Sequence, residues 1–298
     1  MSDFNPEYDI KCTNYTEEQI QKAIDNQSII GCTVIKCSKY FKLVVKLGDN
    51  IEGFIEDKDL ELFKSYNKQA AAISKVGKQI YVVPISIQHL SNKMVVRCSR
   101  LKAQEQCYNN YISKLTPGDV VRAVALKYET YGIFCDIGCG LVALLPTGKI
   151  RIPYILEPLK ENKQIKELYA VINKIHKDGK IELTHKELLG TWNDGLRSIT
   201  KGETRLGKVI GIQDYGYFIM VSQNLHGLAE ICEDKDIQLG DTVTVKILHI
   251  AKNTKRIKLQ VIDKVENQPI FEKYEYTQTS GHIDKWAYYD DSTEVIYF

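Results

Sequence analysis

Residues 116–146 read TPGDVVRAVALKYETYGIFCDIGCGLVALLP, and residues 200–230 read TKGETRLGKVIGIQDYGYFIMVSQNLHGLAE. The two stretches share an early Gly, a Tyr-Gly-x-Phe motif and a later Leu, and each shared residue recurs after 84 positions. A constant interval of this size indicates duplicated structural units. In a chain of 298 residues it predicts three compact units joined by linkers.

Each predicted unit contains five short apolar runs that are rich in Val and Ile and are separated by turn-forming residues. Such runs are typical of β-strands. They are TVIKC, LVVKL, EGFIE, QIYVVPISI and KMVVRCS in the first unit, VVRAVAL, IFCDI, LVALLP, ELYAVINKI and KIELTH in the second, and RLGKVIGI, YFIMV, GLAEI, TVTVKILHI and KRIKLQV in the third. Because five short strands favour a small barrel, the sequence predicts an all-β protein with three tandem five-stranded barrels.

Helical patterns flank the predicted barrels. Thr16-Glu17-Glu18-Gln19 has the form of a capping box, which predicts a helix that runs to about Asn26 and packs as a lid. Helical linkers are predicted where residues recur at helical spacing. These residues are Leu101, Glu105, Tyr108 and Ile112 before the second barrel, and Leu188, Trp192 and Leu196, within residues 185–197, before the third. Gly190 and Gly195 weaken the last helix by about 1 kcal/mol each relative to Ala.

These patterns divide the chain into segments. The expected segments are an N-terminal helical segment (1–27), a first barrel (28–100), a helical linker (101–115), a second barrel (116–184), a second helical linker (185–199), a third barrel (200–263) and a C-terminal extension (264–298). Residues 148–166 interrupt the second barrel with two Pro and many charges, which predicts a long loop or a short helix there.

The C-terminal extension is both acidic and aromatic. It holds three Lys against seven acidic residues, and its aromatic residues include Tyr274, Tyr276, Trp286, Tyr288, Tyr289, Tyr297 and Phe298. Disordered tails seldom hold so many aromatic side chains, so the extension is expected to fold back on a barrel. An alternative is that it mimics nucleic acid and occupies a basic groove.

The formal charge of +2 is unevenly distributed. The first 27 residues hold two Lys against six acidic residues and the extension is acidic too, so the basic excess lies in residues 28–263. A basic body suits a polyanionic partner, although charge alone is a weak indicator of nucleic-acid binding. No apolar run reaches the length of a bilayer, and the N-terminus lacks a basic region followed by an apolar stretch. A cytoplasmic protein without membrane attachment is therefore expected.

No metal, cofactor or catalytic site is expected. The eight Cys form no Cys-x-x-Cys pair and the six His form no His-Glu-x-x-His pattern, so buried, reduced thiols are predicted. Gly148-Lys149 lacks both the earlier Gly and the following Ser or Thr of a phosphate-binding loop. No Gly-x-Ser-x-Gly sequence is present either. The sequence thus favours a binding protein over an enzyme.

The second and third units resemble the S-one domain, the RNA-binding OB-fold repeat of the large bacterial small-subunit ribosomal protein. The resemblance lies in a Gly-rich start, the Tyr-Gly-x-Phe element on the second strand and a closing Lys/Arg-Ile-x-Leu strand. The matching pieces are Gly118 to Val124, Tyr131 to Phe134, Leu144 and Gly179 to Thr184 in one unit, and Gly202 to Ile210, Tyr215 to Phe218, Gly227-Leu228 and Arg256 to Leu259 in the other.

This resemblance implies OB-fold barrels that bind single-stranded RNA, such as mRNA or rRNA, with the ribosome as a further partner. In S-one domains two aromatic side chains stack on bases and a basic residue at the start of the last strand contacts phosphate. The implied binding residues are Tyr131, Phe134 and Lys180 in the second unit, Tyr215, Phe218, Arg256 and Lys258 in the third, and His176 and Lys252 at the position near the last hairpin where the family usually has Asp.

Some positions depart from the family pattern. Where many S-one domains place a His after the third strand, this chain has Pro146 and Glu230. Alignment of Gly53 in the first unit with Gly227 puts Phe41 and Val44 at the stacking positions. The first unit is therefore expected to be a degenerate barrel that has lost its RNA-binding face.

Elementary physics supports the same function. Every base has a π-face, so exposed aromatic side chains bind single strands without demanding a sequence, at roughly 1–3 kcal/mol per stacked base. Nearby Lys and Arg add salt-dependent affinity through counterion release. The sequence thus favours single-stranded RNA binding in translation or RNA metabolism. Two alternatives stay open at this point: a protein-interaction adaptor that docks on the ribosome, and an accessory subunit of a ribonuclease.

Overall fold

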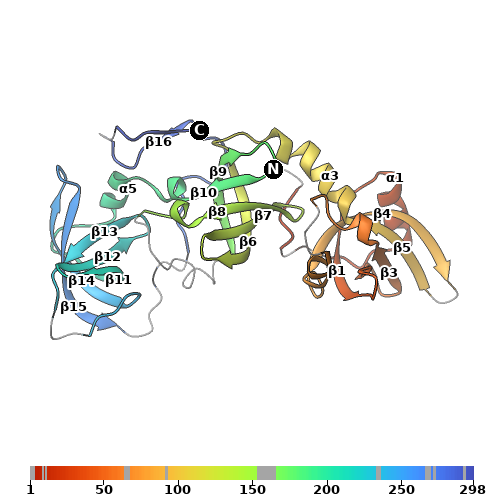
Figure 1. The fold of residues 1–298 in the computed structure, drawn as a ribbon, viewed down its shortest axis with the longest axis horizontal. Helices are drawn as coiled ribbons and strands as arrows, with labels where there is room; N and C mark the ends of the chain where they lie inside the picture. Colours follow the sequence, from red (N-terminus) through yellow and green to blue (C-terminus); the bar gives the residue numbers. More distant parts are fainter. Residues whose placement is uncertain are drawn as a thin grey trace. The chain divides into compact units, whose positions relative to one another are not determined.

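The computed structural model describes residues 4–8, 10, 12–63, 68–90, 93–152, 166–232, 236–265, 270, 273–290 and 293–298 (Figure 1). The chain divides into two compact units. Unit 1 consists of Met1–Leu115 with Asp136–Val142, and unit 2 consists of Thr116–Cys135 with Ala143–Phe298. The domain boundaries expected from the sequence stay a prediction. No helix in the described ranges is long and apolar enough to cross a membrane.

Unit 1 contains the first barrel, barrel 1. Its strands are β1 (Ile30–Cys37), β2 (Leu43–Lys46), β3 (Ile51–Ile55), β4 (Gln79–Leu90) and β5 (Lys93–Ser99). The strand order is β1-β2-β3-β5-β4. The antiparallel pair β1 and β4 closes the barrel, and β3 and β5 run parallel. Alternate side chains point inward, so Val34, Val45 and Val96 are fully buried in one core.

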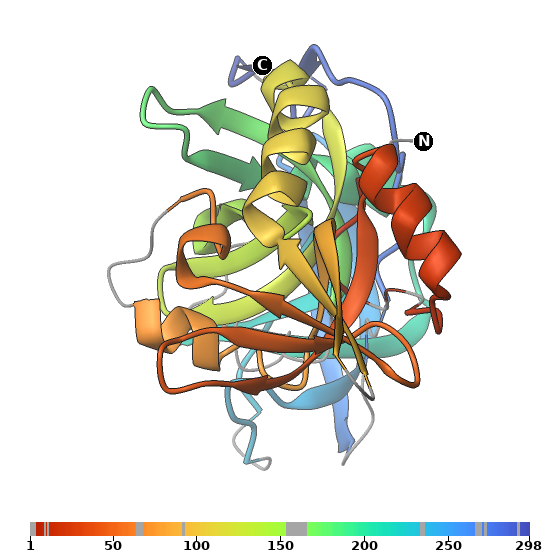
Figure 2. The ribbon, with the colours of Figure 1, turned by 90° about the vertical axis from the view of Figure 1, so that its right-hand side faces the viewer.

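Helices cover barrel 1 (Figure 2). The predicted capping box is present, because the side chains of Thr16 and Gln19 each accept a hydrogen bond from the other's backbone N–H at the start of α1 (Glu17–Asp25). Helix α1 buries Ile20 and Ala23 in the barrel core. The longer α3 (Arg100–Asn110) also packs against β4. The remaining short helices of unit 1 are η1 (Asp57–Asp59), α2 (Lys68–Ile73) and η2 (Ile112–Lys114).

A buried polar cluster ties the N-terminal segment to α3 and to the turn at residues 138–140. Arg100 Nε and Nη2 donate to the two carboxylate oxygens of Glu7 at 2.9 and 2.7 Å. The Glu7 backbone N–H donates to Asp136 Oδ2 at 2.6 Å, and two backbone N–H groups of the turn donate to Asp136 Oδ1. Arg100 and Asp136 are buried, so these contacts replace the hydrogen bonds to water that both side chains lose on folding.

Five of the eight cysteines are buried, as predicted for reduced core thiols. They are Cys32, Cys98, Cys107, Cys135 and Cys139. Cys37 and Cys232 are half-buried and Cys12 is exposed, and all eight are free thiols. Burial raises the pKa of the Cys98 thiol to about 12, which keeps it protonated at neutral pH.

Unit 2 contains barrels 2 and 3. The strands of barrel 2 are β6 (Val120–Glu129), β7 (Gly132–Gly138), β8 (Leu141–Pro146), β9 (Glu167–Ile175) and β10 (Ile181–Thr184), and the turn between β7 and β8 groups with unit 1. Those of barrel 3 are β11 (Thr204–Gln213), β12 (Gly216–Ser222), β13 (Leu225–Ala229), β14 (Thr242–Ala251) and β15 (Arg256–Val265). Both barrels are closed in the strand order of barrel 1. The predicted fold of three tandem five-stranded OB barrels is confirmed.

The linker between barrels 2 and 3 differs from its prediction. In place of one helix over residues 185–197, the structure has a 3₁₀ helix, η5 (Lys186–Leu189), and a short α5 (Trp192–Arg197). Gly190 separates them with φ of 89°, a left-handed conformation that ends a helix and suits Gly. Thr191 then caps α5. Of the predicted loop or helix at 148–166, the 3₁₀ helix η3 (Thr147–Lys149) covers the start, and residues 153–165 lie outside the described ranges.

The C-terminal extension folds back on unit 2, as predicted. The Tyr276 hydroxyl accepts the Tyr169 N–H of β9 and donates to His185 Nε2, both at 3.2 Å. His185 Nδ1 lies 2.7 Å from the Ile150 carbonyl oxygen, which can only accept, so Nδ1 carries the proton. Burial lowers the pKa of His185 to about 4. Further along, Tyr288 is buried in the core of barrel 3.

Two short strands complete the extension. Strands β16 (Lys285–Trp286) and β17 (Ile296–Tyr297) pair antiparallel. The Tyr288 hydroxyl donates to the Asn224 carbonyl oxygen at 2.6 Å, in the turn between β12 and β13. His282 forms a bridge with Asp119 at the start of barrel 2. The extension thus contacts both barrels of unit 2.

The Asp136 carboxyl makes the stability of unit 1 pH-dependent. Burial, and then the charge of Glu7, raise the pKa of Asp136 to about 7 in the folded protein. A carboxyl with a raised folded pKa stabilises the fold below its unfolded pKa of about 4, and this contribution is lost as the pH rises to about 7. Between pH 5 and pH 8, we expect the stability of α3 to fall by at least about 1 kcal/mol more in the wild type than in Asp136→Asn. Amide hydrogen exchange, corrected for intrinsic rates, measures this difference, and equal pH slopes would contradict the expectation.

Tyr276 is expected to stabilise unit 2 through its hydroxyl. Tyr276→Phe leaves the Tyr169 N–H and the His185 Nε2 without their partner, which costs about 1–3 kcal/mol of unfolding free energy. Tyr297→Phe is the control, because Tyr297 is exposed and its substitution should change stability by less than about 0.5 kcal/mol. Urea unfolding followed by the fluorescence of Trp192 and Trp286 measures both. Equal effects of the two substitutions would contradict an anchoring role.

Candidate nucleic-acid interface

Each Tyr-Gly-x-Phe motif lies where the first strand of its barrel turns into the second. A Cβ at Gly132 would lie 2.6 Å from the Leu145 carbonyl oxygen, and a Cβ at Gly216 would lie 2.4 Å from that of Ala229. Cβ atoms essentially never lie closer than 3.0 Å to another heavy atom outside their own residue and its neighbours, so only Gly fits at these two positions. The neighbouring strand therefore lies directly against the motif, and the Tyr before the Gly remains in the turn.

In barrels 2 and 3 the motif Tyr is exposed and meets the motif Phe edge to face. Tyr131 is 57% exposed and Tyr215 is 63% exposed. The ring centres of Tyr131 and Phe134 lie 6.1 Å apart at 88°, and those of Tyr215 and Phe218 lie 6.2 Å apart at 81°. The residue between Gly and Phe points into the core in both barrels. The structure thus brings four of the predicted residues together in two equivalent pairs.

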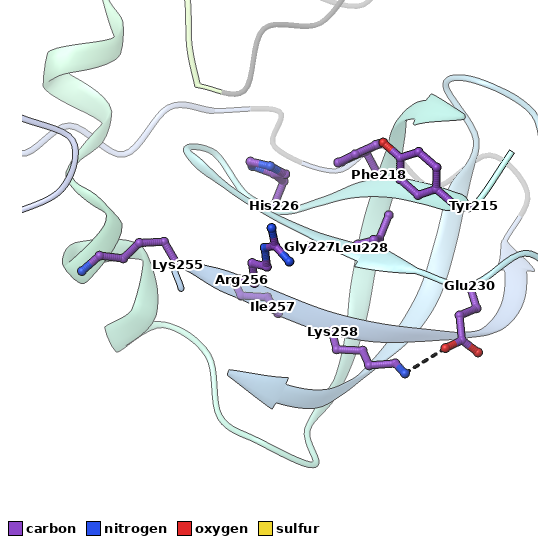
Figure 3. Close-up of a pocket in the computed structure, with 10 residues that line it drawn as sticks. All are labelled: Tyr215, Phe218, His226, Gly227, Leu228, Glu230, Lys255, Arg256, Ile257 and Lys258. Atoms are coloured by element: carbon purple, nitrogen blue, oxygen red, sulfur yellow. Dashed lines mark ion pairs between the residues drawn. The ribbon is translucent and has the colours of Figure 1, made fainter. Parts of the chain in front are cut away.

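In barrel 3 the aromatic pair lines a groove with a volume of about 730 Å³ (Figure 3). The lining residues come from the start of β12, from β13 and from the start of β15. They are Tyr215, Phe218, His226, Gly227, Leu228, Glu230, Lys255, Arg256, Ile257 and Lys258. Figure 3 shows the rings of Tyr215, Phe218 and His226 along one side and the chains of Arg256 and Lys258 on β15 along the other. Aromatic and basic side chains therefore face one groove.

The groove is predominantly basic. Arg256 and Lys258 are two residues apart on β15, so strand alternation places both on the outer face. Lys258 Nζ lies 2.8 Å from Glu230 Oε1, and this hydrogen bond lowers the pKa of Glu230. Both ends of the ion pair are exposed, so solvent screens their attraction. Lys255 Nζ lies 5.7 Å from the ring centre of Tyr289 in the extension.

Phe218 is supported from below by apolar side chains. It packs against Ile210 and Met220, both of which are buried. The positions 84 residues earlier hold Leu126, which is exposed, and Asp136, which is polar. The apolar support of Phe218 is therefore not repeated in barrel 2, and the ring of barrel 3 is the better fixed of the two.

The predicted basic residues of barrel 2 lie at its last hairpin. Lys180 is exposed and its Nζ lies 2.6 Å from Asp178 Oδ2. Glu182 is paired with Leu144 in the parallel ladder, at the place that Lys258 occupies opposite Leu228 in barrel 3. His176 is exposed beside Lys180 and donates its backbone N–H to the Lys180 carbonyl oxygen. The barrel 2 face is thus less basic than that of barrel 3. The last predicted residue, Lys252, is exposed in the turn between β14 and β15 and is not part of the groove lining.

In barrel 1 the equivalent face lacks the Tyr-Gly-x-Phe pair, and its cations contact groups of the same barrel. Val44 pairs with Phe54 in the β2–β3 ladder, where Phe218 pairs with Leu228 in barrel 3. Lys42 Nζ lies 3.6 Å from the centre of the Phe54 ring. Arg97 Nη2 lies 3.0 Å from Asp59 Oδ2. A cation–π contact and an ion pair therefore engage the cations that would otherwise face a ligand.

Among the groove residues that were not predicted as binding residues, His226 and Lys255 carry ring or ammonium nitrogens that can contact a ligand. His226 lies two positions before Leu228, so strand alternation puts both side chains on the outer face of β13. Lys255 adopts a left-handed conformation with φ of 52° in the turn before Arg256. The period-two pattern around Gly227 is the signal that points to His226, whereas the turn conformation that places Lys255 has no clear sequence signal.

Comparisons with known proteins identify similar chains. No protein-family model matches the chain. Small ribosomal subunit protein bS1 of Neisseria meningitidis serogroup B is 28% identical over 199 residues, 61% of this chain. The bS1 protein of Staphylococcus haemolyticus is 24% identical over 302 residues, which cover 94% of this chain and 73% of the relative. A 4-hydroxy-3-methylbut-2-enyl diphosphate reductase of Clostridium acetobutylicum is 25% identical over 261 residues, 82% of this chain.

The chain spans these relatives to different extents. It covers 35% of the Neisseria protein and 39% of the reductase, so a large part of each lies outside the match. The similarity to the staphylococcal protein extends over nearly the whole chain. The resemblance to S-one proteins inferred from the motifs is therefore confirmed: this chain is similar to bacterial small ribosomal subunit proteins bS1.

Proposed function

We propose that the protein binds single-stranded RNA through the outer faces of barrels 2 and 3. The observation that carries this proposal is the pair of exposed Tyr rings, each held edge to face against a Phe at the same place in its barrel. An exposed Tyr ring contributes little to the stability of a barrel, so folding alone does not explain why both rings are exposed. Exposed aromatic pairs with the same geometry in two barrels are typical of a surface on which bases stack.

The chemistry of the groove suits unpaired nucleic acid. A single strand exposes base faces and phosphates together, and the groove of barrel 3 offers rings on one side and cations on the other. Each stacked base contributes roughly 1–3 kcal/mol, and each neutralised phosphate adds salt-dependent affinity. A double helix hides the base faces, so it cannot use the rings in this way.

Barrel 3 is proposed as the stronger of the two binding surfaces. Arg256 and Lys258 face its groove, whereas barrel 2 has Lys180 and Glu182 at the same positions. The Phe218 ring is also held by apolar neighbours, so less freedom is lost when a base stacks on it. Barrel 1 is assigned no part in stacking, because Val44 stands at the place that Phe218 occupies in barrel 3.

The cellular role is proposed from the relatives. Similarity to small ribosomal subunit proteins favours a role in translation, with mRNA or rRNA as the ligand and the ribosome as a partner. We assign the chain no catalytic activity of its own. The match to the reductase leaves most of that protein uncovered, so it supports a shared module better than a shared reaction.

Removal of both exposed rings is expected to weaken RNA binding at least tenfold. The double substitution Tyr131→Ala and Tyr215→Ala removes one stacking partner from each barrel, at roughly 1–3 kcal/mol per base. Fluorescence anisotropy with a short single-stranded RNA measures the dissociation constant. Tyr40→Ala is the matched control, because Tyr40 is 84% exposed in barrel 1 and outside the proposed surface.

The same variants separate binding from folding. Because both Tyr side chains are exposed, the free energy of unfolding of the double variant should lie within about 1 kcal/mol of that of the wild type. An unchanged RNA affinity in a folded double variant would remove the stacking mechanism. Equal weakening by Tyr40→Ala would show that the loss does not belong to the proposed surface.

The groove cations are expected to set the salt dependence of binding. If Arg256 and Lys258 each contact one phosphate, then Arg256→Gln and Lys258→Gln should each flatten the slope of log K against log salt concentration by about 0.7. Lys252→Gln removes a charge from the same hairpin outside the groove lining. It tests whether Lys252 contacts RNA, as the sequence predicts. Titrations from 50 to about 300 mM salt measure the slopes. Identical slopes in all three variants and the wild type would contradict phosphate contacts in the groove.

A further inference from the structure

We propose that His226 contacts the base that stacks on Phe218, and that this contact gives barrel 3 a preference among bases which barrel 2 lacks. The inference rests on the proposed RNA-binding function and deepens it at the same groove. Three observations carry it: the place of the His226 ring, its buried nitrogen without a partner, and the residue that replaces it in barrel 2.

The His226 ring extends the aromatic row of barrel 3. On β13 the side chains of Leu225 and Gly227 are buried and those of His226 and Leu228 are partly exposed. The ring centre of His226 lies 6.2 Å from that of Phe218, and the two planes are tilted by 44°. Figure 3 shows His226 beside Phe218 on the same side of the groove. A base that lies on Phe218 is therefore within reach of the imidazole edge.

The chemistry of the ring favours a hydrogen-bond donor that faces a ligand. His226 Nδ1 is buried and has no hydrogen-bond partner within the described part of the chain. Burial lowers the pKa of this imidazole, so the ring is neutral at neutral pH and carries one proton. A buried N–H without an acceptor is costly, and the proton is therefore expected on Nε2. Nε2–H is then the donor of a partly exposed ring that lines the groove.

A donor beside a stacking surface changes what the surface recognises. Stacking alone tolerates every base, because every base has a π-face. A fixed N–H favours the base whose edge places an acceptor against it, and a base with a donor there leaves both groups unpaired. One such hydrogen bond corresponds to a preference of several-fold between bases.

Barrel 2 provides a comparison within the same chain. The residue 84 positions before His226 is Val142, which is 48% exposed and has no polar side-chain atom. The Tyr and Phe rings of the two barrels have nearly the same geometry. The imidazole is therefore a difference between two otherwise similar aromatic platforms, and any base preference that depends on it belongs to barrel 3.

The test uses the full chain with Tyr131→Ala, so that barrel 3 dominates binding. Dissociation constants are measured for ten-nucleotide oligouridylate, oligocytidylate and oligoadenylate. We expect at least a fivefold spread among the three, and we expect His226→Phe, which keeps a ring but no N–H, to reduce the spread to less than twofold. His226→Gln keeps a donor without the imidazole, so it should retain a preference and bind all three less tightly. Val142→Phe, in the same background, is the matched control and should leave the spread unchanged.

The outcomes separate this inference from the proposed function. The self-stacking of each oligonucleotide is common to all variants, so the change in spread reports on His226 alone. A spread that persists in His226→Phe, or that is absent in the parent, overturns the inference. Tyr215→Ala in the same series tests the proposed RNA-binding function itself. If Tyr215→Ala weakens binding while His226→Phe keeps the spread, only the proposed role of His226 is wrong. If Tyr215→Ala leaves binding unchanged, the proposed RNA-binding function is wrong.

Discussion

The candidate interface depends on how closely one strand approaches the backbone of the next at the motif Gly. In barrel 3 a Cβ at Gly216 would lie only 2.4 Å from the Ala229 carbonyl oxygen, and barrel 2 repeats this close approach at Gly132. Because the strand must begin there without a side chain, the preceding Tyr stays in the turn, outside the barrel wall. Two residues later the pleat directs Phe outward as well. A steric constraint on one backbone atom thus fixes two rings at the surface, edge to face, in both barrels.

The three barrels share a fold and differ in how their outer faces are used. Barrel 3 combines the aromatic pair with Arg256, Lys258 and an apolar support for Phe218. Barrel 2 keeps the aromatic pair but has Glu182 at the place of Lys258. In barrel 1 the Lys42 ammonium lies over Phe54 and Arg97 pairs with Asp59. The outer faces of the three barrels therefore range from one that combines an exposed aromatic pair with basic side chains to one that lacks this pair.

Local signals in the sequence predicted the fold well. The capping box at Thr16 and the fifteen strands depend on neighbouring residues and on the period-two pattern, so they can be recognised without knowledge of tertiary contacts. The sequence predicted one helix through Gly190, where the structure has two short helices. A Gly inside a helical pattern is tolerated or ends the helix according to the φ angle that packing imposes, and this angle cannot be derived from the pattern. The contacts among Glu7, Arg100 and Asp136 join residues 93 and 129 positions apart, and no local pattern signals such a cluster.

The part of the candidate site that could be predicted from the sequence is the part that occurs in both barrels. Tyr131, Phe134, Tyr215 and Phe218 stood out because the same motif occurs twice, and the structure brings each pair together. His226 occurs in one barrel only, so the repeat could not reveal it. Whether Lys180, His176 and Lys252 contact a ligand stays a prediction, since long basic side chains at hairpin turns have no fixed orientation in the sequence pattern.

The anchoring of the extension also sets the order in which unit 2 matures. Tyr276 contacts residues of barrel 2 that precede it by about a hundred positions, and Tyr288 enters the core of barrel 3. During synthesis, the strands of both barrels are made before the segment that covers His185 and contacts Asn224. Until residue 288 has emerged, these polar groups are exposed to water. The two barrels are therefore less stable at this stage than in the complete chain, and they gain stability when the extension packs on them.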